Sequence, residues 1–127
     1  MPSRPIQGVA VAVAILLALS VAALARQPYD AKAFEQAQVE GRTILIHIHA
    51  SWCPTCRRQE PVVERLEKER PGLVVYVVDY DRDKATLKKL GVTSQATLIL
   101  FKGATEVGRL VYDADAGRIA ALVSKGF

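Results

Sequence analysis

The only two cysteines of this 127-residue chain stand two residues apart, in the stretch HASWCPTCRRQEP that begins at His49. Two thiols at this spacing can form a redox couple, supply half of a metal site, or fill space as small apolar side chains. The stretch follows a β-prone run and opens a helical one, so we expect Cys53 at a helix N-terminus. Unpaired N–H groups and the positive end of the helix dipole favour a thiolate there, and Cys53 is therefore the predicted nucleophile.

The residues that follow Cys53 fit the same interpretation. Cys56 lies one helical turn further on, close enough to close a small disulfide ring and more covered, which suits a resolving cysteine. Pro54 stiffens the loop and fits the first helical turn, where its missing N–H costs nothing. Thr55 adds a hydroxyl group without a charge.

The chain after residue 25 alternates helical and strand patterns with short breaks, and it contains no repeat and no low-complexity linker. A helix between two strands implies a parallel crossover, and the last two strands, joined by a short turn, imply an antiparallel hairpin. The sequence predicts one α/β domain with a mixed four-stranded sheet and helices on both faces. Strands are expected at 43–50, 73–81, 96–101 and 106–112, and helices at 31–40, 53–69 and 116–124. A further short helix, capped by Asp81 or Asp83, is expected to run to about Leu90.

The segments ASWCPTC and ATLILFKGATEV, together with Pro61 in the helix, resemble the thioredoxin family over about residues 30 to 127. The Cys-Pro-Thr-Cys pair is similar to exported thioredoxin-like reductants of the cytochrome c maturation and thiol:disulfide interchange type. The resemblance implies attack by Cys53 on a protein disulfide, a mixed disulfide, and release by Cys56, which leaves a Cys53–Cys56 disulfide. It further implies an upstream redox partner, a monomer and no cofactor. Trp52 would be part of the rim on which the partner docks, a half-buried aromatic at the helix entry, or both.

One departure from the family lies at Ala96 and Thr97. Thioredoxin-like proteins usually carry a cis-proline here, in a loop that pairs with the substrate backbone and keeps metals away from the sulfurs. This chain has Gln95-Ala96-Thr97 instead. A cis bond before a non-proline residue costs about 2.5–4 kcal/mol, so we expect a trans Gln95–Ala96 peptide and a reshaped docking edge.

A second departure is His47, at the position where thioredoxins carry a buried acid that is thought to move the proton of the second cysteine. A neutral imidazole could take that role, or His47 could be a core histidine hydrogen-bonded to backbone. Burial would lower the pKa of His47, whereas a nearby Cys56 thiolate would raise it. His49, on the same face of the strand, could stabilise the Cys53 thiolate if protonated.

Two other functions stay open from the sequence. In a metal-handling protein, Cys53, Cys56 and one of His47 or His49 would hold Cu(I) or zinc, because thiolate and imidazole suit both ions. In a non-catalytic adaptor, the disulfide would be inert. The principal prediction is a thiol–disulfide oxidoreductase without a metal, acting as a reductant or exchange protein.

The amino-terminal 25 residues predict export. Arg4 precedes an uncharged apolar run at 8–25, which ends on a small-x-small pattern that a signal peptidase could cut. About 18 apolar residues can also nearly span a bilayer, so residues 1–25 are a signal peptide or a membrane anchor. Either would place the thioredoxin-like domain, 26–127, in the periplasm, free or tethered to the inner membrane through residues 8–25. The formal charge of +4 comes from scattered basic residues, which predicts no nucleic-acid partner.

Overall fold

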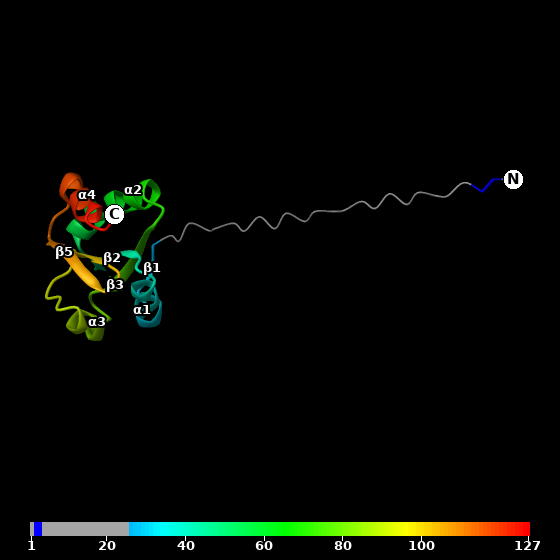
Figure 1. The fold of residues 1–127 in the computed structure, drawn as a ribbon. Coiled ribbons are helices and arrows are strands. Elements are labelled where there is room, and N and C mark those ends of the chain that lie inside the picture. Colours follow the sequence, from blue (N-terminus) through cyan, green and yellow to red (C-terminus); the bar gives the residue numbers. More distant parts are fainter. Residues whose placement is uncertain (1, 4–25) are drawn as a thin grey trace.

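The computed structural model describes residues 2–3 and 26–127 (Figure 1). The apolar run of residues 8–25, predicted to be a signal peptide or a membrane anchor, lies outside the described residues. Within the part that is described, no helix is both long enough and apolar enough to cross a bilayer.

The described chain folds into one sheet between two layers of helices. The sheet order is β1-β3-β2-β4-β5, with β2 parallel to β3 and antiparallel to β4. Figure 1 shows α2 and α4 on one face of the sheet and α1 and α3 on the other. In chain order the elements are β1 (Gln27–Pro28), α1 (Ala31–Val39), β2 (Thr43–His49), α2 (Pro54–Glu69), β3 (Leu73–Asp79), α3 (Lys84–Lys89), β4 (Thr97–Lys102), β5 (Thr105–Val111) and α4 (Ala116–Ser124).

The predicted α/β architecture is confirmed, but the sheet has five strands and not four. The additional strand is β1, which pairs in parallel with β3 through two residues only, Gln27 opposite Tyr76 and Pro28 opposite Val77. Two residues are too few to show an alternating pattern, and Pro28 argues against a strand unless the strand lies at an edge. An edge is where β1 lies.

Short polar residues start three of the four helices in the described region. The carboxylates of Asp30, Asp83 and Asp115 accept backbone N–H groups in the first turns of α1, α3 and α4. Such caps satisfy donors that the helix itself leaves unpaired. The fourth helix, α2, begins with Cys53 in the capping position instead.

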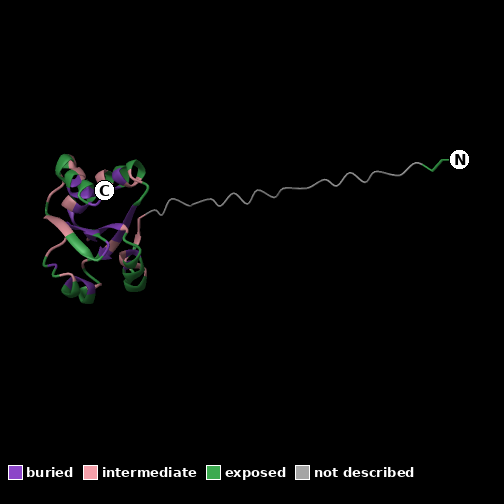
Figure 2. Ribbon diagram, in the orientation of Figure 1, coloured by how far each residue is buried: buried purple, intermediate pink, exposed green. Residues whose placement is uncertain are grey.

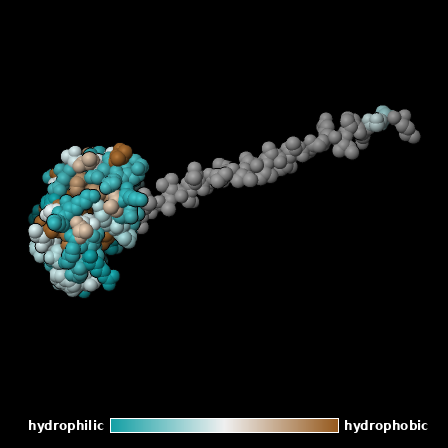
Figure 3. Space-filling model, turned by 90° about the horizontal axis from the view of Figure 1, so that it is seen from below, coloured by the Kyte–Doolittle hydropathy of each residue, from teal (hydrophilic) through white to brown (hydrophobic). Residues whose placement is uncertain are grey.

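The core has two halves, one on each face of β2 (Figure 2). Ile44, Ile46 and Ile48 pack with residues of α1 and α3, whereas Leu45 packs with residues of α2 and α4. Both faces of β2 are therefore covered, as expected for an interior strand. Figure 3, which views the molecule from the side of α1 and α3, shows a largely hydrophilic surface with scattered hydrophobic spots. Isolated spots of this kind are ordinary on a folded surface.

Candidate functional site

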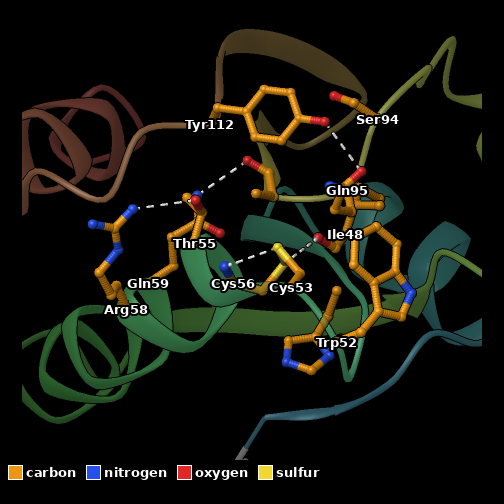
Figure 4. Close-up of a disulfide and its surroundings, with 12 residues drawn as sticks. Ile48, Trp52, Cys53, Thr55, Cys56, Arg58, Gln59, Ser94, Gln95 and Tyr112 are labelled. Carbon is orange, nitrogen blue, oxygen red and sulfur yellow. Dashed lines mark hydrogen bonds between the residues drawn. A yellow bond between two sulfur atoms is a disulfide. The ribbon is translucent and has the colours of Figure 1, made fainter.

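The two cysteines form a disulfide at the N-terminus of α2 (Figure 4). Cys53 occupies the N-cap position with extended backbone angles, φ −87° and ψ 111°. Its Sγ accepts the backbone N–H of Cys56 at 3.1 Å, and the two Cα atoms are 5.3 Å apart. A cap atom in this position meets the positive end of the helix dipole, so the site favours negative charge on Cys53 once the disulfide is opened.

Cys53, predicted to be the less covered of the two cysteines, is itself buried in the disulfide form. Cys53 is only 1% exposed and Cys56 is completely buried. The two cysteines cluster with Ala50 and Ala96, and Tyr80 packs against the same group. These neighbours come from the end of β2 and from later loops. The local sequence around the cysteines therefore does not predict that they cover the disulfide. Attack on Cys53 Sγ therefore requires a movement of the side chains around it.

Trp52 lies on the surface beside the disulfide (Figure 4). It is 53% exposed, and its Nε1–H donates to Asp81 Oδ2 at 2.9 Å. Its ring also meets Tyr80 edge-on, with 6.5 Å between the ring centroids. The Trp52 ring is thus fixed and half exposed, and its role as part of a docking rim stays a prediction.

Pro54 and Thr55 separate the cysteines as the sequence suggests. Pro54 is the first residue of α2, and Thr55 is partly exposed in the first turn. The Thr55 hydroxyl accepts a hydrogen bond from Arg58 Nη2 at 3.3 Å. One Arg58 nitrogen is therefore directed to Thr55.

The loop that faces the disulfide contains Ala96 in the position of the family's cis-proline. The described residues contain no cis peptide bond, so the Gln95–Ala96 bond is trans, as expected, and Ala96 adopts φ +57°. Its N–H donates to the Ile48 carbonyl at 2.9 Å. Thr97 is buried at the start of β4, and its hydroxyl donates to the Ser94 carbonyl at 2.8 Å. The loop that faces the disulfide is thus built on a left-handed alanine, and its role as a docking edge stays a prediction.

Tyr112 is a site residue that the sequence analysis missed. It follows β5, has φ +56°, and its N–H donates to the Ala96 carbonyl at 3.0 Å. Its hydroxyl donates to Gln95 Oε1 at 3.1 Å, on the side of the disulfide where Gln95 lies (Figure 4). Nothing in the local sequence points to a tyrosine in a conformation that usually belongs to glycine. Only the pairing of the two segments brings it to the site.

His47 is a core histidine, but its partner is a side chain and not the backbone. It is fully buried, and its Nε2 lies 3.0 Å from Gln59 Oε1. Its Nδ1 has no hydrogen-bond partner. Burial lowers the pKa of His47 to about 4, and the hydrogen bond with Gln59 opposes this shift only in part. His47 is therefore neutral at pH 7.

Gln59 is the second site residue that the sequence analysis missed. It is fully buried in α2, on the helix face that also carries Cys56, Val63 and Leu66. This spacing of three, four and three residues was a usable signal, because it places a polar side chain on the core-facing side of the helix. A glutamine there needs partners from other elements.

His49 is paired with a carboxylate. Its Nε2 lies 2.5 Å from Glu60 Oε1, and its ring stands edge-on to that of His47, with 5.6 Å between the centroids. Glu60 also lies 3.9 Å from Arg26 Nη2. The structure thus brings His49 to Glu60 of α2, which also pairs with Arg26 before β1. The predicted effect of His49 on the Cys53 thiolate stays a prediction.

The described residues do not form a ligand set for the metal-handling alternative. Among residues 2–3 and 26–127, no group of three or more histidine, cysteine or acidic side chains is placed to hold a metal ion. His47 faces Gln59, His49 faces Glu60, and both sulfurs are in the disulfide.

Comparison with known proteins agrees with this geometry. The Thioredoxin family model matches residues 25–125. A thioredoxin of Chlamydia muridarum (strain MoPn / Nigg) is 37% identical over 82 residues, which cover 65% of this chain and 80% of that protein. The crystal structure of Trxlp from Edwardsiella tarda EIB202 is 35% identical with a TM-score of 0.73, covering 77% of this chain and 97% of that one.

The thioredoxin of Fasciola hepatica gives a similar result. Its X-ray structure has a TM-score of 0.71 at 30% identity and covers 80% of this chain and 99% of that chain. The sequence match, the shared fold and the Cys-x-x-Cys disulfide at the start of α2 agree. The chain therefore belongs to the thioredoxin family and is a protein-disulfide oxidoreductase.

Proposed function

We propose that this protein reduces or exchanges disulfides of protein substrates outside the cytoplasm, with Cys53 as the nucleophile and Cys56 as the resolving cysteine. The observation that carries the assignment of roles is the position of Cys53 as the N-cap of α2, where its sulfur accepts the Cys56 N–H. A thiolate at Cys53 gains that hydrogen bond and the helix dipole. Cys56, inside the first turn, is completely buried.

The reaction starts from the dithiol form. The Cys53 thiolate attacks one sulfur of the substrate disulfide, forms a mixed disulfide and expels a substrate thiolate. Cys56 then loses its proton, and its thiolate attacks Cys53 Sγ and expels the second substrate thiolate. Two electrons pass to the substrate and the Cys53–Cys56 disulfide is left. A second thiol-containing redox partner must return two electrons for the next cycle.

Regeneration begins from the structure described here, in which Cys53 is covered. The partner's thiolate must reach Cys53 Sγ past the loop at Ala96 and the surface side chain of Trp52 (Figure 4). Docking of a partner is thus expected to accompany a movement of this rim. Reduction of the disulfide by dithiothreitol is the direct check, because failure to reduce it would favour an inert adaptor.

The proposed direction of electron flow, toward the substrate, is supported by the likeness of the Cys-Pro-Thr-Cys motif to reductant and interchange proteins. The reduction potential of the Cys53–Cys56 couple tests it. A value near that of thioredoxin, about −270 mV, would support a reductant, and a value near about −120 mV would make the protein an oxidant.

The proposed location, the periplasm, is supported by the sequence of residues 1–25 and by a single cysteine pair that suits an oxidising space. We expect a monomer, free or tethered through residues 8–25. Fractionation of cells that express the full chain, followed by sequencing of its amino terminus, separates a cut signal peptide from a retained anchor. Recovery of the uncut chain in the cytoplasm would exclude export.

Substrates can be identified by trapping. A Cys56→Ala variant cannot complete the second step, so partners accumulate as mixed disulfides with Cys53. The same preparation from a Cys53→Ala variant is the matched control. Metal analysis of protein purified under reducing conditions tests the alternative, because stoichiometric Cu(I) or zinc retained after dialysis would favour a metal-handling protein.

A further inference from the structure

The Gln59 side chain connects three segments around the disulfide. Its Nε2 donates to the carbonyl of Ala96 at 3.0 Å and to the carbonyl of Asp113 at 3.0 Å. Its Oε1 lies 3.0 Å from His47 Nε2. One fully buried carboxamide on α2 thus reaches β2, the loop before β4 and the segment after β5, close to the disulfide (Figure 4).

The partners dictate the orientation of this carboxamide. Carbonyl oxygens only accept hydrogen bonds, so the NH2 end of Gln59 must face Ala96 and Asp113 and uses both of its hydrogens there. Its oxygen then faces His47, which must donate Nε2–H. A carboxylate at position 47 would place an acceptor opposite Gln59 Oε1, which is also an acceptor, and no hydrogen would lie between them. The histidine that replaces the family's buried acid is therefore the donor that Gln59 requires.

The two segments that Gln59 holds are also the strained ones. Ala96 and Tyr112 are the only non-glycine residues with positive φ in the described chain, at +57° and +56°. A left-handed conformation costs such residues about 1–2 kcal/mol each, and it persists only where the surroundings enforce it. The Ala96 carbonyl accepts from both Gln59 Nε2 and the Tyr112 N–H, so one carbonyl oxygen joins all three segments.

We propose that Gln59 is a positioning residue for disulfide exchange, whose carboxamide holds the Gln95–Ala96 edge and Tyr112 in the geometry that receives an extended protein segment beside Cys53. The inference rests on the proposed function. The Gln95–Ala96 edge contains no proline to restrict its backbone, and in this proposal the buried Gln59 carboxamide orders it instead. A protein disulfide needs this edge, whereas a small disulfide needs only the sulfur of Cys53.

The experiment compares two disulfides in single turnover. Prereduced protein, freed of reductant, is mixed with insulin or with 5,5′-dithiobis(2-nitrobenzoate), and the second-order rate constant is measured for each. We expect Gln59→Leu to lower the insulin constant about tenfold, equivalent to about 1.4 kcal/mol, and to change the small-disulfide constant less than about twofold. The change in the ratio of the two constants is what a merely structural role would not produce.

Val63→Ala is the matched control, because Val63 is a buried α2 residue outside the disulfide cluster and its truncation also destabilises the fold. In Val63→Ala, the ratio of the insulin rate constant to the small-disulfide rate constant should equal that of the unchanged protein. Equal losses on both disulfides in Gln59→Leu, or an unchanged insulin constant, would overturn the inference. Failure of the unchanged protein to react with either disulfide would instead overturn the proposed function.

Two further measurements guard against a Gln59→Leu variant that does not fold. The double variant His47→Leu/Gln59→Leu removes donor and acceptor together and so avoids a buried unpaired group between them. It should show the same loss of the insulin constant as Gln59→Leu. In the unchanged protein, ¹⁵N chemical shifts of the His47 ring should show the Nε2–H tautomer, and an Nδ1–H tautomer would overturn the assigned orientation.

Discussion

On one side of the disulfide, Cys53 caps α2, Pro54 opens the helix and Trp52 is fixed by Asp81. On the other side, Ala96 and Tyr112 adopt left-handed backbone conformations that proline cannot adopt. The helix side matches the thioredoxin pattern, and apart from the Trp52–Asp81 hydrogen bond its order comes from contacts within the first turn of α2. The loop side departs from that pattern, and its order comes from hydrogen bonds between segments that are far apart in sequence.

The difference separates two parts of the reaction. Thiolate stabilisation depends on the N-terminus of α2, which needs only the local sequence around Cys53. Substrate alignment depends on the loop side, where Gln59 joins Ala96 and Asp113. Substitutions on the helix side should therefore change the rate of disulfide exchange itself. Substitutions on the loop side should change the stability of the fold or the preference for one substrate over another.

The largest effect is expected from Cys53→Ser. A serine hydroxyl is not ionised at neutral pH and cannot form the mixed disulfide, so reduction of both insulin and a small disulfide should fall to the uncatalysed rate. Cys56→Ser, by contrast, should keep the first step and accumulate the mixed disulfide, which mass spectrometry detects. Full activity of Cys53→Ser would mean that Cys56 is the attacking residue.

Restoration of the family's residue on the loop side should damage this protein. Proline at 96 cannot adopt φ +57° and would remove the N–H that Ala96 donates to Ile48. We expect Ala96→Pro to lower the free energy of unfolding by about 3 kcal/mol or more, measured by urea denaturation. Ala96→Gly is the control and should lie within about 1 kcal/mol of the unchanged protein, because relief of the left-handed strain offsets the entropy cost of glycine. An Ala96→Pro protein of normal stability would show that the loop is readily rebuilt.

The same division between the two sides explains what the sequence could predict. The helix boundaries, the parallel crossover from β2 to β3, the hairpin of β4 and β5 and the Cys53–Cys56 arrangement follow from patterns a few residues long, and all of them were expected. The trans bond at Ala96 was expected as well, since it follows from the chemistry of one peptide bond. The burial of Cys53, the conformation of Tyr112 and the partner of His47 were not, because each depends on residues at least twelve positions away or on the packing of whole segments.

The His47–Gln59 pair should make stability depend on pH. The pKa of His47 is about 4 in the fold, against an ordinary value of 6.5, because burial disfavours the charged ring. The unfolded chain therefore binds the extra proton first as pH falls, and the stabilisation, complete above about 6.5, is lost between 6.5 and about 4. The loss should reach about 3 kcal/mol. Urea denaturation at pH 7.5 and at pH 4 measures it.

The control for this pH effect is His47→Gln, which keeps an N–H donor but does not titrate. The pKa of Asp113 is lowered by its hydrogen bond from Arg118, and this carboxylate titrates in both proteins. The difference between the two pH profiles therefore reports His47 alone. Parallel profiles would show that His47 is not the neutral partner of Gln59 in the fold.

The smallest effect is expected from Tyr112→Phe, which removes the hydrogen bond from the Tyr112 hydroxyl to Gln95 and keeps the ring and the backbone. Tyr112 is 54% exposed, so water replaces the lost partner and the free energy of unfolding should change by less than about 0.5 kcal/mol. Gln59→Leu, which leaves buried His47 without its acceptor, should cost about 1–3 kcal/mol in the same measurement. If Tyr112→Phe lowered the free energy of unfolding as much as Gln59→Leu, the exposed Tyr112–Gln95 hydrogen bond would stabilise the loop side as much as the buried Gln59 carboxamide does.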